Sequence, residues 1–175
     1  MTKIAFRPMR LEDLPLMHEW LGRPHIASWW DGLPTLDEVI ADYRPVISED
    51  GPHKCYFAVA DGEPIGFIQS YVPALAHAEG WWLDEHDTGV RGIDQFLCDS
   101  ESLGKGLGTA MVSAFIDYLF EDPAVTRIQT DPSPENARAI RCYEKAGFHA
   151  TGVIETLDGR ALLMYCDRPS RRVIR

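Results

Sequence analysis

The sequence lacks the features that mark membrane, secreted and metal-binding proteins. None of its apolar runs is long enough to span a bilayer, and the first residues, MTKIAFRPMRLEDL, contain no extended apolar core of the kind found in signal peptides. The cysteines are Cys55, Cys98, Cys142 and Cys166, which lie far apart and form no C-x-x-C pair. The six histidines show no H-E-x-x-H or other ligand spacing, so we expect no metal. These absences predict a cytoplasmic protein with reduced thiols.

Basic residues are also scarce. The chain has 17 lysines and arginines against 27 aspartates and glutamates, which gives a formal net charge of -10. Nucleic acids and anionic membranes bind basic surfaces, so we expect neither as a partner. A cationic substrate fits the excess of acid better. The length of 175 residues suits a single domain over 1–175, with a short basic tail, DRPSRRVIR, that begins at about residue 167 and is expected to be frayed.

Hydrophobic periodicity and turn residues predict an α/β fold of mixed character. Gly22 and Pro24 are expected to close the first helix, and Thr35 with Glu38 has the spacing of a capping box that starts the second. Tight hairpins are expected across 61–62 and 158–159. Hairpins near both ends with alternating strands and helices between them indicate a mixed sheet with helices on both faces. We predict strands over 4–8, 55–60, 64–72, 90–98, 125–131, 148–156 and 161–166, and helices over 11–21, 35–45, within 103–120, and over 134–146.

A glycine-rich turn, LGKGLG at 103–108, opens directly into a helix with an apolar stripe. Gly104, Gly106 and Gly108 allow successive backbone N–H groups to face one point, and the start of the helix adds partial positive charge. Lys105 adds a full charge. A tight strand-to-helix turn is the alternative. The spacings G-x-x-x-x-G-K-[ST] and G-x-G-x-x-G of other phosphate loops are absent, and we interpret the turn as a cradle for a pyrophosphate.

An irregular stretch over 73–88 combines carboxylates with indoles. Its acids and tryptophans are Glu79, Trp81, Trp82, Asp84, Glu85 and Asp87. A second pair, Trp29 and Trp30, lies between the first two helices. A solvated loop with a buried anchor and tryptophans that only fill the core are the alternatives. Carboxylates and indoles together can also hold a polyamine through ion pairs and cation–π contacts, which is the interpretation we favour.

Two motifs in the second half resemble the GNAT superfamily of N-acetyltransferases. One is the loop LGKGLG, and the other is PENARAIRCYEKAGF at 134–148, which follows the strand IQTDP. The stretches EWLGRPHIASWW, GEPIGFIQSY and EGWWLDEHDTGVRGIDQ are similar to the aminoglycoside 6'-N-acetyltransferases, and the similarity runs from about Phe6 to Tyr165. The resemblance implies a GNAT-type central mixed, largely antiparallel sheet flanked by helices, acetyl-CoA as the cofactor, and transfer of acetyl to the 6'-amine of aminoglycosides, which confers resistance.

The resemblance also implies where acetyl-CoA binds. The loop amides hold its pyrophosphate, the strand before the loop lies beside its pantetheine arm, and Asn136 bonds a pantetheine amide. Leu103 departs from the Gln or Arg that is common at the first position of the loop. The expected cofactor-binding residues are Phe96, Leu97, Cys98, Leu103, Gly104, Lys105, Gly106, Leu107, Gly108, Thr109, Asn136 and Tyr143.

Acetyl transfer to an amine requires that one group accepts a proton and another donates one. An alkylamine has a pKa of roughly 10.4, so it arrives protonated, and Asp94 is expected to assist its deprotonation either directly or through water. Tyr143 is expected to protonate the leaving thiolate. A structural carboxylate and a core tyrosine are the respective alternatives. The expected substrate-binding residues are Trp29, Trp30, Glu79, Trp81, Trp82, Asp94, Asp131 and Asp158.

Two other functions remain open from the sequence. One is a metabolic N-acyltransferase of small amines or of lysine-derived siderophore precursors, which would need fewer carboxylates. The other is a GNAT-shaped module that binds acetyl-CoA without catalysis, which the presence of both Asp94 and Tyr143 argues against. The expected partner is a polycationic small molecule, and the expected assembly is a monomer or a homodimer.

Overall fold

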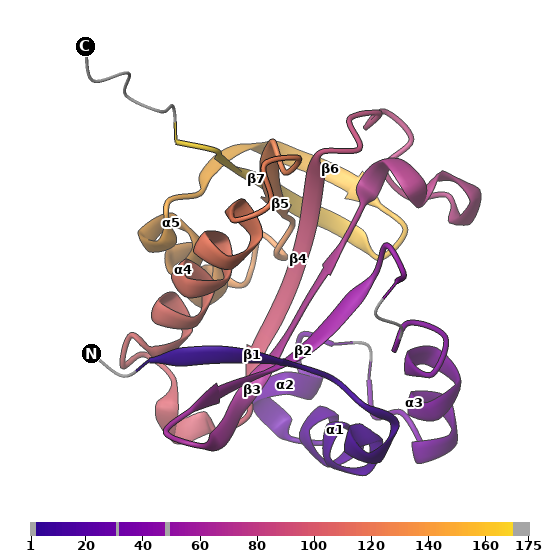
Figure 1. The fold of residues 1–175 in the computed structure, drawn as a ribbon, viewed down its shortest axis with the longest axis vertical. Coiled ribbons are helices and arrows are strands. Elements are labelled where there is room, and N and C mark those ends of the chain that lie inside the picture. Colours follow the sequence, from indigo (N-terminus) through magenta and orange to yellow (C-terminus); the bar gives the residue numbers. More distant parts are fainter. Residues whose placement is uncertain (1–2, 31, 48–49, 170–175) are drawn as a thin grey trace.

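The computed structural model describes residues 3–30, 32–47 and 50–169, and within them seven strands form one sheet (Figure 1). The strand order is β1-β2-β3-β4-β5-β7-β6. Only β4 and β5 pair in parallel, while the other neighbours are antiparallel, so the expected mixed and largely antiparallel sheet is confirmed. The strands are β1 (Ile4–Pro8), β2 (Lys54–Ala60), β3 (Glu63–Tyr71), β4 (Val90–Leu97), β5 (Arg127–Thr130), β6 (His149–Thr156) and β7 (Gly159–Asp167).

Both expected hairpins are present, and their turns use local backbone chemistry. Asp61 and Gly62 have φ values of 52° and 86°, the left-handed pair that a two-residue turn between twisted strands requires. The β6–β7 turn lies one residue earlier than expected, at 157–158, where the Thr156 hydroxyl donates to the Gly159 carbonyl at 2.8 Å. Short turns of this kind fix the strand register on both sides of the sheet.

Helices cover both faces of the sheet (Figure 1), as expected. The capping box at Thr35 is confirmed, and Gly147 closes α5 with a left-handed φ of 106°. The prediction at Gly22 and Pro24 is wrong in part, because Gly22 is right-handed and Pro24 begins a further helix, where its missing N–H costs no hydrogen bond. The helices are η1 (Leu11–Asp13), α1 (Leu14–Leu21), α2 (Pro24–Ala27), α3 (Leu36–Tyr43), η2 (Pro73–Leu75), η3 (His77–Glu79), η4 (Ser100–Ser102), α4 (Leu107–Phe120) and α5 (Ala137–Ala146).

Alternating side chains on the central strands divide the core between the two faces. Phe57 and Phe67 pack with Trp20 on the side of α1 and α3. Their neighbours Tyr56 and Ile68 pack on the opposite side, with α4 and α5. The period of two along β2 and β3 therefore builds a two-sided core. In the described part of the chain, no helix is long and apolar enough to cross a membrane.

Strands β4 and β5 are paired over a short stretch only. Their parallel register covers only Val90 to Gly92 on β4 and Arg127 to Gln129 on β5. Beyond that point β4 stays paired with β3 as far as Leu97. The second half of β4 therefore presents its other edge to the space that contains the candidate site.

The start of the tail that was expected to be frayed is anchored to the rest of the protein. Arg168 donates from Nε to the Val125 carbonyl at 2.8 Å and from Nη1 to the Phe120 carbonyl at 2.9 Å, so it is anchored to the end of α4. Its guanidinium also lies over the Phe120 ring, 4.9 Å from the centroid. The rest of the predicted tail, 170–175, lies outside the described residues.

Candidate active site

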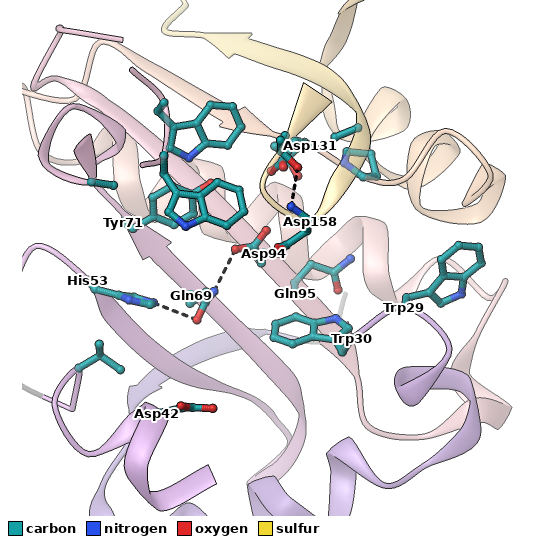
Figure 2. Close-up of a pocket in the computed structure, with 18 of the residues that line it drawn as sticks. Trp29, Trp30, Asp42, His53, Gln69, Tyr71, Asp94, Gln95, Asp131 and Asp158 are labelled. Atoms are coloured by element: carbon teal, nitrogen blue, oxygen red, sulfur yellow. Dashed lines mark hydrogen bonds between the residues drawn. The ribbon is translucent and has the colours of Figure 1, made fainter. Parts of the chain in front are cut away.

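A cavity of about 830 Å³ opens between the sheet, the α1–α3 side of the molecule, the 73–88 loop and the β6–β7 hairpin (Figure 2). Its lining contains every residue that the sequence analysis proposed for the substrate. The structure thus gathers side chains from five separate parts of the chain around one space. Their contact with a substrate stays a prediction. These lining residues are Trp29, Trp30, Glu79, Trp81, Trp82, Asp94, Asp131 and Asp158.

A second cavity, of about 380 Å³, lies between the end of β4, the glycine turn and α5. Three of the expected cofactor residues line neither cavity: Cys98 is buried with its thiol toward the Pro64 carbonyl, Lys105 is exposed, and Leu107 packs against Leu97 and Met111. Tyr143 lines the larger cavity instead. The expected residues that do line the smaller cavity are Phe96, Leu97, Leu103, Gly104, Gly106, Gly108, Thr109 and Asn136.

The smaller cavity has a basic wall that the sequence analysis missed. Arg138, Arg141 and Lys145 lie on one face of α5 and line the cavity with His25 of α2. Their spacing of three and four residues is the signal that could have found them, because such positions share a helix face. Three cations beside the glycine turn suit a ligand that carries several phosphates.

The glycine turn has the backbone that the phosphate-cradle interpretation requires. Gly104 and Gly106 have φ values of 72° and 86°, and Gly106 is the N-cap of α4. The first N–H groups of a helix have no partner within the helix, so they are free to bind an anion. Gly108 lies against the Cys142 thiol, since a Cβ there would be 3.5 Å from the sulfur.

Several residues form a wall shared by the two cavities. These are Trp29, Trp30, Gln95, Asn136 and Ala139. Trp30 is held in place by edge contacts with Phe67 and Phe96, at centroid distances of 5.8 and 5.1 Å. The two cavities therefore meet beside the exposed edge of β4.

Five carboxylate residues of the described chain line the larger cavity, each from a separate part of the fold (Figure 2). They are Asp42, Glu79 and three that interact electrostatically with one another. Asp94 lies on β4, Asp131 directly follows β5, and Asp158 is in the β6–β7 turn. Burial raises the pKa of Asp94, while a hydrogen bond from Gln69 and the charge of His53 act in the opposite direction. Burial and repulsion from Asp94 and Asp158 raise the pKa of Asp131 to about 8. A ligand that brings ammonium groups would relieve this repulsion.

Tyr143 is both a core residue and a cavity residue. It is 4% exposed, packs edge-on against Phe148 at a centroid distance of 5.3 Å, and reaches the larger cavity. Burial raises the pKa of its phenol, and hydrogen bonding to Thr130 and Gln95 offsets only part of that rise. The phenol is therefore protonated near neutral pH and can donate its proton.

The lining of the larger cavity also includes residues that the sequence analysis missed. Gln69 and Tyr71 lie on β3 two positions apart, so they share one face of the sheet and line the cavity. Tyr71 lies directly over Gly92, because a Cβ there would be 2.1 Å from its Cζ atom. Alternation along 67–71 was the available signal, although the pairing with β4 was needed to use it.

Trp82 has an unusual backbone for its residue type. Its φ is 51°, in the left-handed region that a bulky side chain rarely adopts. The adjacent Trp81 ring is tilted toward it at a centroid distance of 6.3 Å. The 73–88 loop thus holds two indoles on the cavity wall at some cost in backbone strain.

Comparison with known proteins agrees with this fold. Residues 10–156 match the family model described as an acetyltransferase (GNAT) domain. The chain is 52% identical over 164 residues to the aminoglycoside N(6')-acetyltransferase type 1 of Klebsiella pneumoniae, covering 92% of this chain and 81% of that protein. A crystal structure of aminoglycoside acetyltransferase AAC(6')-Ib with coenzyme A and kanamycin is 51% identical, with a TM-score of 0.89 and 95% of each chain covered.

A more distant relative is named for a different acceptor, lysine. The lysine N-acyltransferase MbtK of Mycolicibacterium paratuberculosis is 24% identical over 171 residues, which cover 95% of this chain and 74% of that protein. The identity is less than half of that to the Klebsiella protein.

Proposed function

The chain belongs to the GNAT acetyltransferase family, and from that premise we propose that it transfers acetyl from acetyl-CoA to the 6'-amine of aminoglycoside antibiotics and thereby confers resistance. The observation that carries the proposal is the convergence of Asp94, Asp131 and Asp158 on one cavity lined by indoles. A ligand with several ammonium groups can interact favourably with more than one of these acidic side chains, whereas a monoamine can pair with only one. The 52% identity to a named aminoglycoside 6'-N-acetyltransferase supports the same substrate class.

The smaller cavity fits coenzyme A. The glycine turn and the start of α4 would bind the pyrophosphate through backbone N–H groups, and the basic face of α5 would add charge. The Asn136 Oδ1 atom accepts the Ala139 N–H at 3.1 Å, which leaves its Nδ2 group available to donate to the pantetheine arm. Bound acetyl-CoA supplies an activated acetyl thioester. The backbone near Phe96 and Leu97 would polarise its carbonyl.

Proton transfers in the proposed reaction belong to Asp94 and Tyr143. An ammonium group at the junction of the cavities would pair with Asp94, which removes its proton directly or through a water molecule and leaves a neutral amine to attack. Tyr143 then donates its phenolic proton to the departing sulfur. The raised pKa of Asp94 makes this carboxylate a stronger base. The raised pKa of Tyr143 keeps its phenol protonated near neutral pH, so the proton is present when the sulfur departs.

Other parts of the proposal follow from charge and from the same cavity. We expect a polycationic small molecule as the only class of acceptor, no nucleic acid partner, a cytoplasmic location, and a single catalytic domain over 1–175 that acts as a monomer or homodimer. Lysine-derived amines are the second candidate, because the MbtK relative covers 95% of this chain.

Thiol release from acetyl-CoA tests the proposal. The purified protein is offered kanamycin, gentamicin, a 6'-hydroxyl aminoglycoside and N-hydroxylysine separately. We expect turnover with the first two and none with the 6'-hydroxyl compound, which differs at the acceptor atom and therefore reports the position acetylated. Turnover on N-hydroxylysine alone would assign the chain to lysine acylation, and binding of coenzyme A without any turnover would assign it to a non-catalytic module.

A further inference from the structure

Three side chains form a continuous line of hydrogen bonds that ends at Asp94 (Figure 2). His53, just before β2, contacts Gln69 on β3 with 2.9 Å between its Nε2 and the Gln69 Oε1. The Gln69 Nε2 donates to the Asp94 Oδ2 at 2.9 Å. The sheet aligns the last two residues, because Gln69 and Asp94 are register partners in the antiparallel β3–β4 pair.

The chemistry of the groups fixes the direction of this line. An ionised carboxylate only accepts hydrogen bonds, so the side-chain NH₂ of Gln69 must face Asp94. Its carbonyl oxygen then faces His53, whose Nε2 must carry the hydrogen. An amide passes a proton along only by becoming an imidic acid, which is a high-energy tautomer. The line therefore positions Asp94 and does not relay its proton.

The line opposes the other influences on Asp94. Burial and the charge of Asp158 raise the pKa of Asp94, whereas Gln69 and His53 lower it. Asp131, Tyr71, Tyr143, Tyr43 and Cys55 also interact electrostatically with the Asp94 carboxylate from the surrounding elements. Among these groups of the described residues, Gln69 hydrogen-bonds the carboxylate directly, at Oδ2, so the other oxygen is left to face the cavity.

We propose that Gln69 is a positioning residue which, held by His53, orients the Asp94 carboxylate toward the acceptor amine. The identity of the amine rests on the proposed function. The orientation of Asp94 by Gln69 rests on the geometry of the described residues. The part of His53 in this orientation is to hold Gln69.

A double-mutant cycle tests whether the two residues act as one unit. In Gln69→Leu we expect kcat/KM for kanamycin to fall by roughly 10-fold to 100-fold, mainly through kcat, because the variant loses a hydrogen bond to a charged group. We expect a fall of roughly 3-fold to 10-fold in His53→Phe. In the double variant the loss should equal that of Gln69→Leu within about twofold, since His53 has nothing left to hold.

Matched variants separate this role from a general structural one. His53→Gln keeps a side-chain N–H that can donate to Gln69 and should retain most of the activity, unlike His53→Phe. His149→Phe removes an exposed histidine on β6 and should leave kcat/KM unchanged. The acid limb of the kcat/KM profile should move to higher pH in Gln69→Leu, because the carboxylate has lost a donor that favours its charged form.

Several results would overturn the inference. Unchanged kcat/KM in Gln69→Leu would show that Asp94 needs no such partner, and losses that multiply in the double variant would show that His53 acts independently. If the wild-type protein turns over none of the amines, the proposed function fails. Carbon-13 NMR titration of the Asp94 carboxyl in the ligand-free protein still tests the hydrogen bonds from His53 through Gln69 to Asp94. We expect a higher Asp94 pKa in Gln69→Leu than in wild type, and equal values would refute the inference by themselves.

Discussion

Replacing Asp131 with asparagine tests whether the ligand-free site holds a protonated carboxyl group near neutral pH. Burial and repulsion from Asp94 and Asp158 raise the pKa of Asp131 to about 8 from the ordinary value of 3.8. Between these values the unfolded chain has lost a proton that the folded protein retains. The unfolded state therefore binds fewer protons, and the free energy of unfolding falls as pH rises from about 4 to about 8.

The size of the effect follows from the width of this window. Each pH unit lowers the free energy of unfolding by at most about 1.4 kcal/mol, so the two units between pH 6 and pH 8 set a ceiling of about 3 kcal/mol. A cavity of about 830 Å³ has room for water, which would screen the charges of these carboxyl groups. We therefore expect about 1 kcal/mol. Asparagine carries no charge at any pH, so Asp131→Asn does not lose this stability. Its free energy of unfolding relative to wild type should therefore rise by that amount between pH 6 and pH 8.

Thermal unfolding followed by circular dichroism at pH 6.0 and pH 8.5 measures this difference. For a chain of this length, about 1 kcal/mol corresponds to a Tm change of about 2–4 °C. Asp117→Asn is the control, because Asp117 is exposed on α4 and faces no carboxylate cavity. A Tm difference between Asp131→Asn and wild type that is the same at both pH values would refute the reasoning, since it would mean that Asp131 is ionised throughout this range.

Three further substitutions test other parts of the site. Tyr143→Phe should lower kcat by about 100-fold with little change in KM, because it removes only the proton donor, and an unchanged rate of thiol release would exclude Tyr143 as the acid. Gly106→Ala should raise the KM for acetyl-CoA by about fivefold, since the φ of 86° costs a side chain about 1 kcal/mol, whereas Gly62→Ala, with the same φ in a distant hairpin, should leave that KM unchanged. Gly92→Ala should lower the Tm and raise the KM for kanamycin, because the added Cβ would lie 2.1 Å from the Tyr71 Cζ atom and would displace that ring from the cavity wall. A Tm and a KM equal to those of wild type would count against this packing.

Features that depend on neighbouring residues were predictable from the sequence. The capping box at Thr35, the left-handed stop at Gly147 and the Asp61–Gly62 hairpin each involve four residues or fewer, and all are present. Pro24 was misjudged because proline can end one helix or begin the next, and only the packing of Ile26 in the core decides between them.

Features that depend on strand pairing were less accessible. The end of the β4–β5 pairing at Gly92 is a property of two strands more than thirty positions apart, and no local pattern encodes it. Gln69 was missed for the same reason, because its contact with Asp94 exists only in the β3–β4 register. The resemblance supplied Asp94 and Tyr143, while the residues that position them became visible only in three dimensions.

The wall shared by the two cavities restricts how this site can change during evolution. A substitution at Trp30, Gln95 or Asn136 alters the surroundings of donor and acceptor together, so a gain for a new acceptor is accompanied by a change in affinity for coenzyme A. Glu79, Trp81 and Asp158 line only the larger cavity, on a loop and a turn. Adaptation to new drugs should therefore accumulate at those two surface segments, where selection can act on the acceptor alone.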